Sequence, residues 1–392
     1  MTQHLDIAIV VVAYNRPDSL NRLLDSLTKV NYEGHNVPLI ISIDYSGKDD
    51  VYLAAEAFEW KFGDKKIIRN QENLGLKKHV LSCGDLVKEF DAVIILEDDL
   101  LVSPAMYSYA WRAVEKYRDD ENVASISLYA KEFSETANKP FVPAFSGSDT
   151  YFIQTAESWG QIWTRDRWLE FNEWYKNNEV FVISPDIPKN VCEWDDKSWK
   201  KHHIRYCIEK NLFTVYPYMG LSTCVGEEGE HVKINMNTFQ VPLLDGKLKS
   251  FRFSDFDDKN AIKYDAFLER IFTDYPDVCF DLYGQKTCYD SYRYVITRKP
   301  LNYKITETYG LTFRPHEDNI LNREKGDYFI KYDLSQRASN TIRFKSETAM
   351  KYYNYVDFCD VTNQMRVKDI FSHLMRVIKY RIKKKLCRRK SI

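Results

Sequence analysis

The sequence of 392 residues has no long apolar run, which argues against a membrane-spanning helix. The longest early apolar run, residues 7–13, is far shorter than the ~20 residues that a span requires. No basic segment precedes this run, so we do not expect it to be a signal peptide. We interpret it as a buried strand.

Paired cysteine motifs, internal repeats and net charge are also missing. The eight cysteines include no C-x-x-C pair, which predicts reduced thiols in a cytosolic protein. Lys and Arg number 56 and Asp and Glu number 57, so the net charge of −1 identifies no class of partner. With 44% apolar and 29% charged residues, the composition excludes a disordered or collagen-like chain.

The charge is unevenly distributed along the chain. Residues 366–392 contain 11 basic residues and one acidic residue, a local charge of +10. Five apolar residues fall at helical spacing among them: Phe371, Leu374, Met375, Ile378 and Ile382. Residues 362–392 are therefore predicted to be a basic amphipathic tail that binds an anionic membrane surface. A solvated terminus is the alternative, and no nucleic-acid partner is expected because no recognised motif accompanies the basic run.

Strands and helices alternate over the first 130 residues. Apolar runs predict strands at residues 7–13, 39–43, 66–69, 92–96 and 123–128. Helical periodicity predicts helices at residues 17–27 and 76–90 and a third that begins at Ser103-Pro104, with Ser as N-cap. This order is typical of an α/β domain with a mostly parallel sheet, in which ligands bind beyond the carboxyl ends of the strands.

Polar residues stand at three of these strand ends: Tyr14-Asn15-Arg16, Asp44, and Glu97-Asp98-Asp99. Three consecutive carboxylates could be a solvated loop. Here a buried strand delivers them, and such a rigid position suits a divalent cation. Mg²⁺ and Mn²⁺ prefer oxygen ligands, so the carboxylates and the diphosphate of a nucleotide could share the metal.

The residues at these strand ends resemble a known family. The segments Val10–Pro17, Asp44, Asn73-Leu74-Gly75 and Ile94–Leu100 look like those of a GT-A glycosyltransferase of the family-2 type. Glu97–Leu100 with the following Ser103-Pro104 is especially similar to the inverting N-acetylglucosaminyltransferase that initiates complex N-glycans. The resemblance covers roughly residues 5–235. It implies a Rossmann-like GT-A fold, Mn²⁺ or Mg²⁺ as cofactor, and a nucleotide-sugar donor, with UDP as the expected nucleotide.

The resemblance also assigns roles to residues. Asp99 would bind the metal, Asp98 the ribose and Glu97 the transferred sugar. Asp44 would accept a hydrogen bond from N3–H of the base, and Tyr14, Asn15 and Arg16 would lie at the nucleotide. His79 resembles a nucleotide-contacting histidine, although a core histidine is equally compatible with its place in a helix.

A second acidic site follows in the tryptophan-rich segment. An inverting transfer needs a carboxylate that takes the acceptor proton, and Trp194-Asp195-Asp196 resembles the segment that carries this base in the related enzymes. Asp195 is the first choice and Asp196 the second, with Trp194 shaping the sugar subsite. Alternatively, the two aspartates cap the helix that follows.

Two further segments resemble parts of the same family. Glu157-Ser158-Trp159-Gly160 is similar to the donor-sugar region of bacterial relatives, although a tryptophan in the core would explain it equally well. The loop that ends at His231 resembles a flexible glycine-containing loop that closes over the donor, so His231 is a candidate ligand of the metal or the diphosphate.

Together these features predict a GT-A domain at residues 1–244, an accessory α/β region of unknown role at 245–361, and the basic tail. The expected activity is an inverting, metal-dependent transfer to a glycan or lipid-linked acceptor. The expected setting is bacterial surface-polysaccharide biosynthesis at the inner face of the cytoplasmic membrane. A sugar-phosphate nucleotidyltransferase and a non-catalytic carbohydrate-binding protein remain alternatives.

Overall fold

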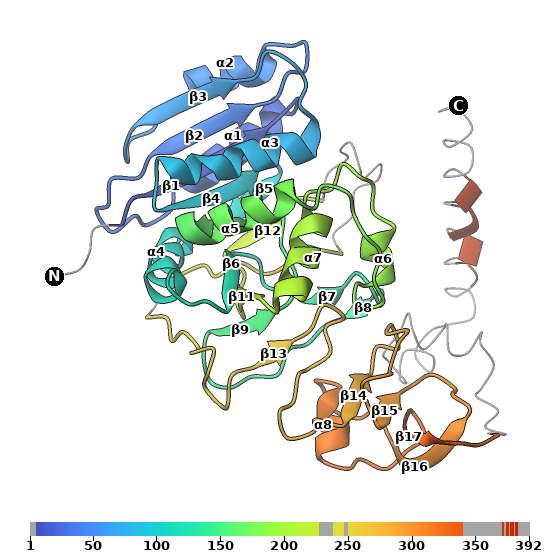
Figure 1. Ribbon diagram of the computed structural model, residues 1–392. Helices are drawn as coiled ribbons and strands as arrows, with labels where there is room; N and C mark the ends of the chain where they lie inside the picture. Colours follow the sequence, from blue (N-terminus) through green and yellow to red (C-terminus); the bar gives the residue numbers. More distant parts are fainter. Residues whose placement is uncertain are drawn as a thin grey trace. The chain divides into compact units, whose positions relative to one another are not determined.

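The computed structural model describes residues 5–226, 238–246 and 250–339, together with a few helical residues between 371 and 382. The chain divides into two units, Met1–Asn340 and Thr341–Ile392. Figure 1 shows the first unit as a large α/β body followed by a smaller sheet. His231 and most of the predicted basic tail lie outside the described residues.

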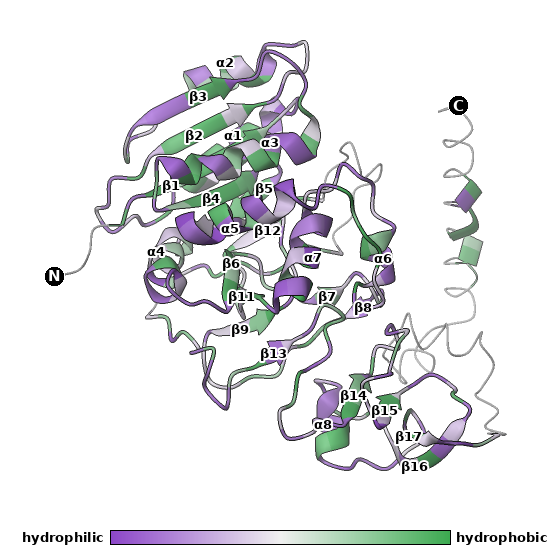
Figure 2. Ribbon diagram, viewed as in Figure 1, coloured by the Kyte–Doolittle hydropathy of each residue, from purple (hydrophilic) through white to green (hydrophobic). Residues whose placement is uncertain are grey.

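The first unit is built around one nine-stranded sheet. In spatial order its strands are β13 (Lys263–Tyr264), β9 (Thr150–Ile153), β11 (Phe213–Pro217), β6 (Val123–Ser127), β10 (Gln161–Thr164), β4 (Ala92–Glu97), β1 (Ile7–Ala13), β2 (Leu39–Ile43) and β3 (Lys65–Arg69). The five strands predicted from apolar runs are confirmed, each to within one residue at its ends. The continuous apolar character of β1, β2 and β4 reflects burial on both faces. In Figure 2, β2 and β4 are accordingly green, whereas the edge strand β3 is mostly purple.

Helices cover both faces of this sheet. On one face, Ile9 and Val11 of β1 pack with α1 (Pro17–Leu27), α2 (Asp50–Ala57) and α4 (Met106–Tyr117). On the other face, Val10 and Val12 pack with α3 (Gly75–Gly84), α5 (Arg165–Lys176) and α7 (Lys200–Lys210). The domain is therefore a three-layer α/β/α structure, which confirms the predicted fold class.

Two helix predictions need correction. The predicted helix at 76–90 divides into α3 and a 3-10 helix, Asp85–Lys88. The break lies at Gly84, where the indole of Trp168 occupies the space that a Cβ would need. Ser103 does not cap a helix: its hydroxyl accepts the N–H of Ala105 at 3.1 Å, and α4 begins only at Met106. The residues just after the acidic triplet instead form β5 (Leu100–Val102).

Strand direction decides which residues meet. β1, β2, β4, β6 and β11 run in the same direction, whereas β9 and β10 run against them. The starts of β9 and β10 therefore lie at the same edge of the sheet as the carboxyl ends of β1, β2, β4, β6 and β11. Three small elements flank this edge: β12 (Ser222–Cys224) paired with β5, β7 (Phe133–Ser134) paired with β8 (Lys139–Pro140), and α6 (Lys189–Cys192).

A second, four-stranded sheet follows in sequence. Its order is β14 (Val278–Asp281), β15 (Tyr294–Thr297), β17 (Phe329–Arg337) and β16 (Tyr303–Tyr309), with α8 (Glu317–Leu321) between the last two in sequence. β13 precedes this sheet and pairs with β9 of the large sheet. The boundary predicted after residue 244 stays a prediction.

None of the helices in the described part of the chain has the length and apolar composition needed to cross a bilayer. The six described cysteines are free thiols, as the sequence predicts.

Candidate active site

The acidic triplet ends the central strand β4, and Arg16 from the end of β1 binds two of its members. The Arg16 guanidinium donates to Asp99 Oδ2 at 3.0 Å and also pairs with Asp98. The side chain of Asp98 is 3% exposed and that of Asp99 is 23% exposed. Adjacent parallel strands thus bring Tyr14-Asn15-Arg16 and the triplet together, as the sequence predicts.

Repulsion and burial make this cluster electrostatically strained. Burial, followed by repulsion from Asp99 and Asp98, raises the pKa of Glu97 to about 8. Burial also raises the pKa of Asp98 to about 6, although Arg16 opposes this change. Three carboxylates face one guanidinium, so the site carries more negative charge than its own residues compensate.

Asp99 keeps one oxygen available. Its Oδ1 is buried and has no hydrogen-bond partner among the described residues, which is costly unless a ligand binds there. A divalent cation with oxygen ligands fits this orphaned atom. No group of three or more potential ligand residues converges within the described ranges, so protein ligands alone do not form a closed metal site there. His231, the other candidate ligand, is not described.

Asp44 lies at the end of the neighbouring strand β2. Its Oδ1 accepts the N–H of Leu74 at 2.9 Å, and its Oδ2 accepts the N–H of Gly75 at 2.9 Å. Asp44 therefore fastens the turn that begins α3, where Gly75 has φ +72°. Asn73 of the same turn donates to the Tyr14 hydroxyl at 3.2 Å. These contacts bring together Tyr14, Asp44 and the turn at Asn73–Gly75.

Two predicted nucleotide residues differ in their surroundings. Asn15 is exposed at the sheet edge. His79 is 2% exposed, and its Nε2 hydrogen-bonds the Ser42 hydroxyl at 2.7 Å. Burial lowers the pKa of His79. Its described contact is that of a core histidine, and its role at the nucleotide stays a prediction.

Trp159 and Gly160 lie at the start of β10. The Trp159 ring packs 4.9 Å from Tyr129 and 5.1 Å from Phe239, measured between ring centroids. Gly160 has φ +105°, and a Cβ there would lie 2.7 Å from Ser222 Oγ. Only glycine fits this close approach of two loops at the sheet edge.

The predicted base stands on the turn before α7. Asp195 Oδ1 accepts the N–H of Lys197 at 2.8 Å, so Asp195 shapes the turn. The alternative that the two aspartates cap the helix is wrong, because Trp199 is the N-cap of α7 and no side-chain hydrogen bond caps it. The Asp196 side chain is 93% exposed and pairs with Lys201 at 3.0 Å. This hydrogen bond from Lys201 lowers the pKa of Asp196. Both carboxylates are accessible, and neither catalytic role is tested by these contacts.

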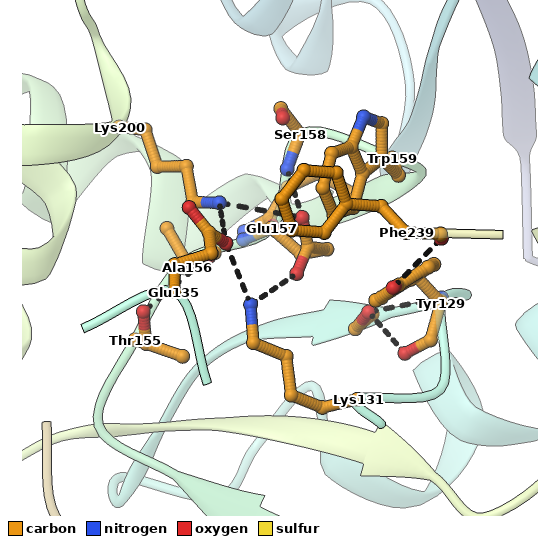
Figure 3. A network of polar contacts seen from close by, with 12 residues as sticks. Tyr129, Lys131, Glu135, Thr155, Ala156, Glu157, Ser158, Trp159, Lys200 and Phe239 are labelled. Carbon is orange, nitrogen blue, oxygen red and sulfur yellow. Dashed lines mark hydrogen bonds and ion pairs between the residues drawn. The ribbon is translucent and has the colours of Figure 1, made fainter. Parts of the chain in front are cut away.

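Four residues form a buried ion quartet that the sequence analysis missed as a unit. Glu157 contacts Lys131 and Lys200, each at 3.4 Å, and Glu135 contacts the same two lysines at 2.9 and 3.6 Å. Glu157 is fully buried. Figure 3 shows the four side chains converging between the loops that carry Trp159 and Tyr129. The only sequence signal was the Lys131/Glu135 spacing just beyond a strand end.

Lys200 connects the quartet to both tryptophans of the predicted sugar site. Its Nζ lies 5.5 Å from the ring centroid of Trp159 and 5.5 Å from that of Trp194. Lys200 also lowers the pKa of Glu97 by attraction, although burial and the neighbouring aspartates outweigh it. Lys200 therefore interacts both with Trp194, next to the two aspartates, and with Glu97 of the acidic triplet.

The donor-loop prediction is only partly covered by the described residues. The N–H of Val225 donates to the backbone oxygen of Asp99 at 2.8 Å. The segment that leads to His231 thus starts beside the acidic triplet. Nothing is described for residues 227–237.

Comparison with solved structures gives distant similarities. The chain is 12% identical to TarS residues 1–349 from S. aureus, with a TM-score of 0.35, covering 56% of this chain and 60% of that one. It is 15% identical to the mannosyltransferase PcManGT from Pyrobaculum calidifontis, solved with GDP-Man and Mn²⁺; the TM-score is 0.38 and coverage is 59% and 60%. GalNAc-T7, solved with UDP, GalNAc and Mn²⁺, is 15% identical, with a TM-score of 0.40 and coverage of 56% and 43%.

The chain thus aligns with at most about three fifths of each of these solved chains. No curated protein matches it. A family model described as glycosyl transferase family 2 matches residues 8–167, which include β1, β2, β4 and the acidic triplet. Over these residues, the chain is similar to the glycosyl transferase family 2.

Proposed function

We propose that the protein is an inverting, metal-dependent glycosyltransferase that moves a sugar from a UDP-linked donor to a glycan or lipid-linked acceptor. The observation that carries this proposal is the incomplete acidic cluster at the end of β4. Asp99 Oδ1 is buried without a partner inside the segment that is similar to glycosyl transferase family 2. An activated sugar diphosphate with its cation would supply the missing positive charge.

The nucleotide would lie across the ends of β1 and β2. Asp44 already accepts the backbone N–H groups of Tyr45, Leu74 and Gly75, and its fourth contact is a long one, 3.5 Å from the Asn70 amide. A carboxylate has about four lone-pair sites, so the N3–H of a base would take the place of the Asn70 amide. Tyr14 and Asn15 would border the nucleotide, and Asp98 would bind the ribose. His79 would contribute to the nucleotide site indirectly, through its hydrogen bond to the Ser42 hydroxyl.

Asp99 would hold Mn²⁺ or Mg²⁺, with His231 as a further candidate ligand. Such an ion neutralises a diphosphate leaving group as charge develops on it. Arg16, which pairs with Asp98 and Asp99, would lie near the nucleotide at the same edge. Glu97, Trp159, Gly160 and Trp194 would border the transferred sugar.

Asp195 would take the proton of the acceptor hydroxyl, with Asp196 as the second candidate. The acceptor oxygen forms a bond to the anomeric carbon while the bond from that carbon to the diphosphate oxygen breaks. The electron pair of the broken bond leaves on the nucleotide diphosphate, and attack from the opposite face inverts the anomeric centre. The exposure of both aspartates would let an acceptor approach them.

The basic tail would hold the enzyme at an anionic membrane, near a lipid-linked acceptor of surface-polysaccharide assembly. Among the described tail residues, Phe371, Leu374 and Ile382 are helical and exposed. Exposed apolar residues beside basic ones favour an interfacial location.

The experiment is a donor screen that measures nucleotide release from UDP-, GDP- and dTDP-sugars with Mn²⁺. We expect release from at least one UDP-sugar. Asp195→Asn should abolish transfer while UDP affinity, measured by calorimetry, stays unchanged. Asp186→Asn, on a nearby exposed loop, is the matched control. No release from any donor, together with no metal-dependent UDP binding, would refute the proposal.

A further inference from the structure

A cavity of about 410 Å³ opens at the same sheet edge as the acidic triplet. It is lined by Ala130, Lys131, Glu132, Pro140, Phe141, Val142, Pro143, Tyr151 and Tyr218. Its volume lies inside the ~300–1,000 Å³ range of small-molecule sites. None of these residues belongs to the predicted nucleotide site.

The topology fixes where this cavity lies relative to Glu97. Lys131 follows the end of β6, Tyr218 follows the end of β11, and Tyr151 begins β9. These strands are the second, third and fourth from β4 in the sheet. Since neighbouring strands lie ~4.8 Å apart, the cavity is about 10–20 Å along the edge from the end of β4. A ligand extended along the edge would reach both places.

The walls of the cavity are mainly aromatic and apolar. The rings of Tyr151 and Tyr218 lie 4.6 Å apart at an angle of 35°, and Phe145 packs edge-on against Tyr218 at 5.1 Å. Phe145 is 70% exposed, and Val142 on the lining is 41% exposed. Covering an exposed aromatic face with an apolar ring face is favourable, because both surfaces are removed from water. The C–H face of a pyranose is such a surface, and its hydroxyls would remain toward Glu132 and solvent.

One residue connects this cavity to the predicted site of chemistry. Lys131 lines the cavity and pairs with Glu157, and Glu157 pairs with Lys200. Lys200 Nζ in turn lies over the rings of Trp159 and Trp194. The wall of the cavity and the two tryptophan loops are therefore held by one set of buried ion pairs.

We propose that this cavity binds a pyranose unit of the acceptor glycan. The inference rests on the proposed glycosyltransferase function and narrows its acceptor to a saccharide. The bound unit stacks on Tyr218, and the saccharide continues along the edge past Trp159 toward the end of β4.

The test is saturation-transfer NMR on the full chain with the methyl pyranosides of glucose, galactose, mannose and N-acetylglucosamine. Sorbitol, which has hydroxyls but no ring face, is the ligand control. We expect transfer to at least one pyranoside and none to sorbitol. Val142→Arg should block the cavity and weaken that binding at least about tenfold, equivalent to ~1.4 kcal/mol. Val182→Arg, at an exposed valine on another loop, should leave it unchanged.

Tyr218→Phe and Tyr218→Ala add a second measurement. The phenylalanine variant keeps the ring and should bind normally, whereas the alanine variant should bind as weakly as Val142→Arg. No transfer to any pyranoside, or equal binding in Val142→Arg and Val182→Arg, would overturn the proposal.

Nucleotide release without acceptor, measured on the same variants, separates this failure from failure of the proposed function. Release that persists while the sugar result is negative refutes only the acceptor cavity. Absence of both release and metal-dependent UDP binding refutes the proposed function itself.

Discussion

Two clusters of charged residues lie at one edge of the sheet, and they differ in completeness. In the ion quartet, two lysines alternate with two glutamates, so every charge has partners of opposite sign within 3.6 Å. In the acidic triplet, Arg16 pairs with Asp98 and Asp99, and Asp99 Oδ1 has no partner among the described residues. The first cluster is neutral by itself, and the second is not.

This difference indicates that the quartet stabilises the fold, whereas the triplet is suited to bind a ligand. Buried charges are tolerated when they are paired and hydrogen-bonded, as in the quartet. The triplet instead has carboxyl groups of raised pKa and one unpartnered buried oxygen on Asp99. A cluster that its own chain leaves short of positive charge is suited to bind a cation from solution.

The largest expected effect comes from breaking the neutral cluster. Glu157→Gln leaves Lys131 and Lys200 sharing only Glu135. Removing one partner of a buried pair costs about 3–5 kcal/mol. Urea unfolding should therefore show a loss of stability of that order. Lys189→Gln, in an exposed pair with Glu193, should cost at most about 0.5 kcal/mol.

The double variant Lys131→Gln/Glu157→Gln refines this test. It restores neutrality, so it should recover part of the stability that Glu157→Gln loses. A Glu157→Gln protein as stable as the parent would mean that the quartet contributes nothing as a unit.

The next effect concerns the acidic triplet, where a substitution should lower turnover and not the free energy of unfolding. Asp99→Asn should lower turnover by about 10²–10³-fold, because the metal supplies several kcal/mol to the transition state. Its free energy of unfolding should stay equal or rise, since one repelling charge is removed. Nucleotide release, Mn²⁺ binding by electron paramagnetic resonance and urea unfolding give the three readouts. Asp119→Asn, on the exposed surface, is the control.

These two clusters also show what a sequence alone can reveal. The triplet was predictable because its three acids are consecutive and an apolar strand delivers them to a known edge. The central parallel strands were predictable for a similar reason, because their apolar runs record burial on both faces; the edge strand β3 is only half-buried. The role of Asp44 in fastening the Leu74–Gly75 turn was not, since it depends on residues 30 positions away.

The quartet could not be predicted because it is non-local. Lys131 and Glu157 come from two separate loops and Lys200 from the start of α7, and the antiparallel insertion of β9 and β10 brings them together. The late helix start at Met106 has a similar origin. Residues 100–102 pair with β12, more than a hundred positions away, and the helix begins only beyond that pairing.

Acid should weaken the ion quartet by protonating Glu135, and the protein should lose folding stability as a result. Burial alone would raise the pKa of Glu135, but attraction to Lys131 and Lys200 lowers it to about 2, from an ordinary value of 4.5. The unfolded chain therefore takes up this proton first as pH falls. The resulting stability is fully present above about pH 4.5 and is lost toward about pH 2, on the order of 2 kcal/mol.

Urea midpoints measured through this range test the acid response. Glu135→Gln should be less stable at neutral pH, and its stability should depend less on pH over this range. If the two proteins lose stability in parallel, groups other than Glu135 govern the acid response.

The smallest expected effect concerns Arg16, which either competes with a metal ion for Asp99 or holds Asp99 in place for it. Its guanidinium lies 3.0 Å from Asp99 Oδ2, so an incoming cation meets a positive charge already at the carboxylate. Arg16→Gln removes that competition, and Mn²⁺ should bind about tenfold more tightly, a change of ~1.4 kcal/mol. Electron paramagnetic resonance without nucleotide measures this directly. Arg112→Gln, which breaks the pair with Glu33 on another face of the domain, is the matched control. Weaker Mn²⁺ binding in Arg16→Gln would instead mean that Arg16 holds Asp99 in the geometry that the metal needs. Arg16 would then order the acidic triplet, as Lys131 and Lys200 order the glutamates of the quartet.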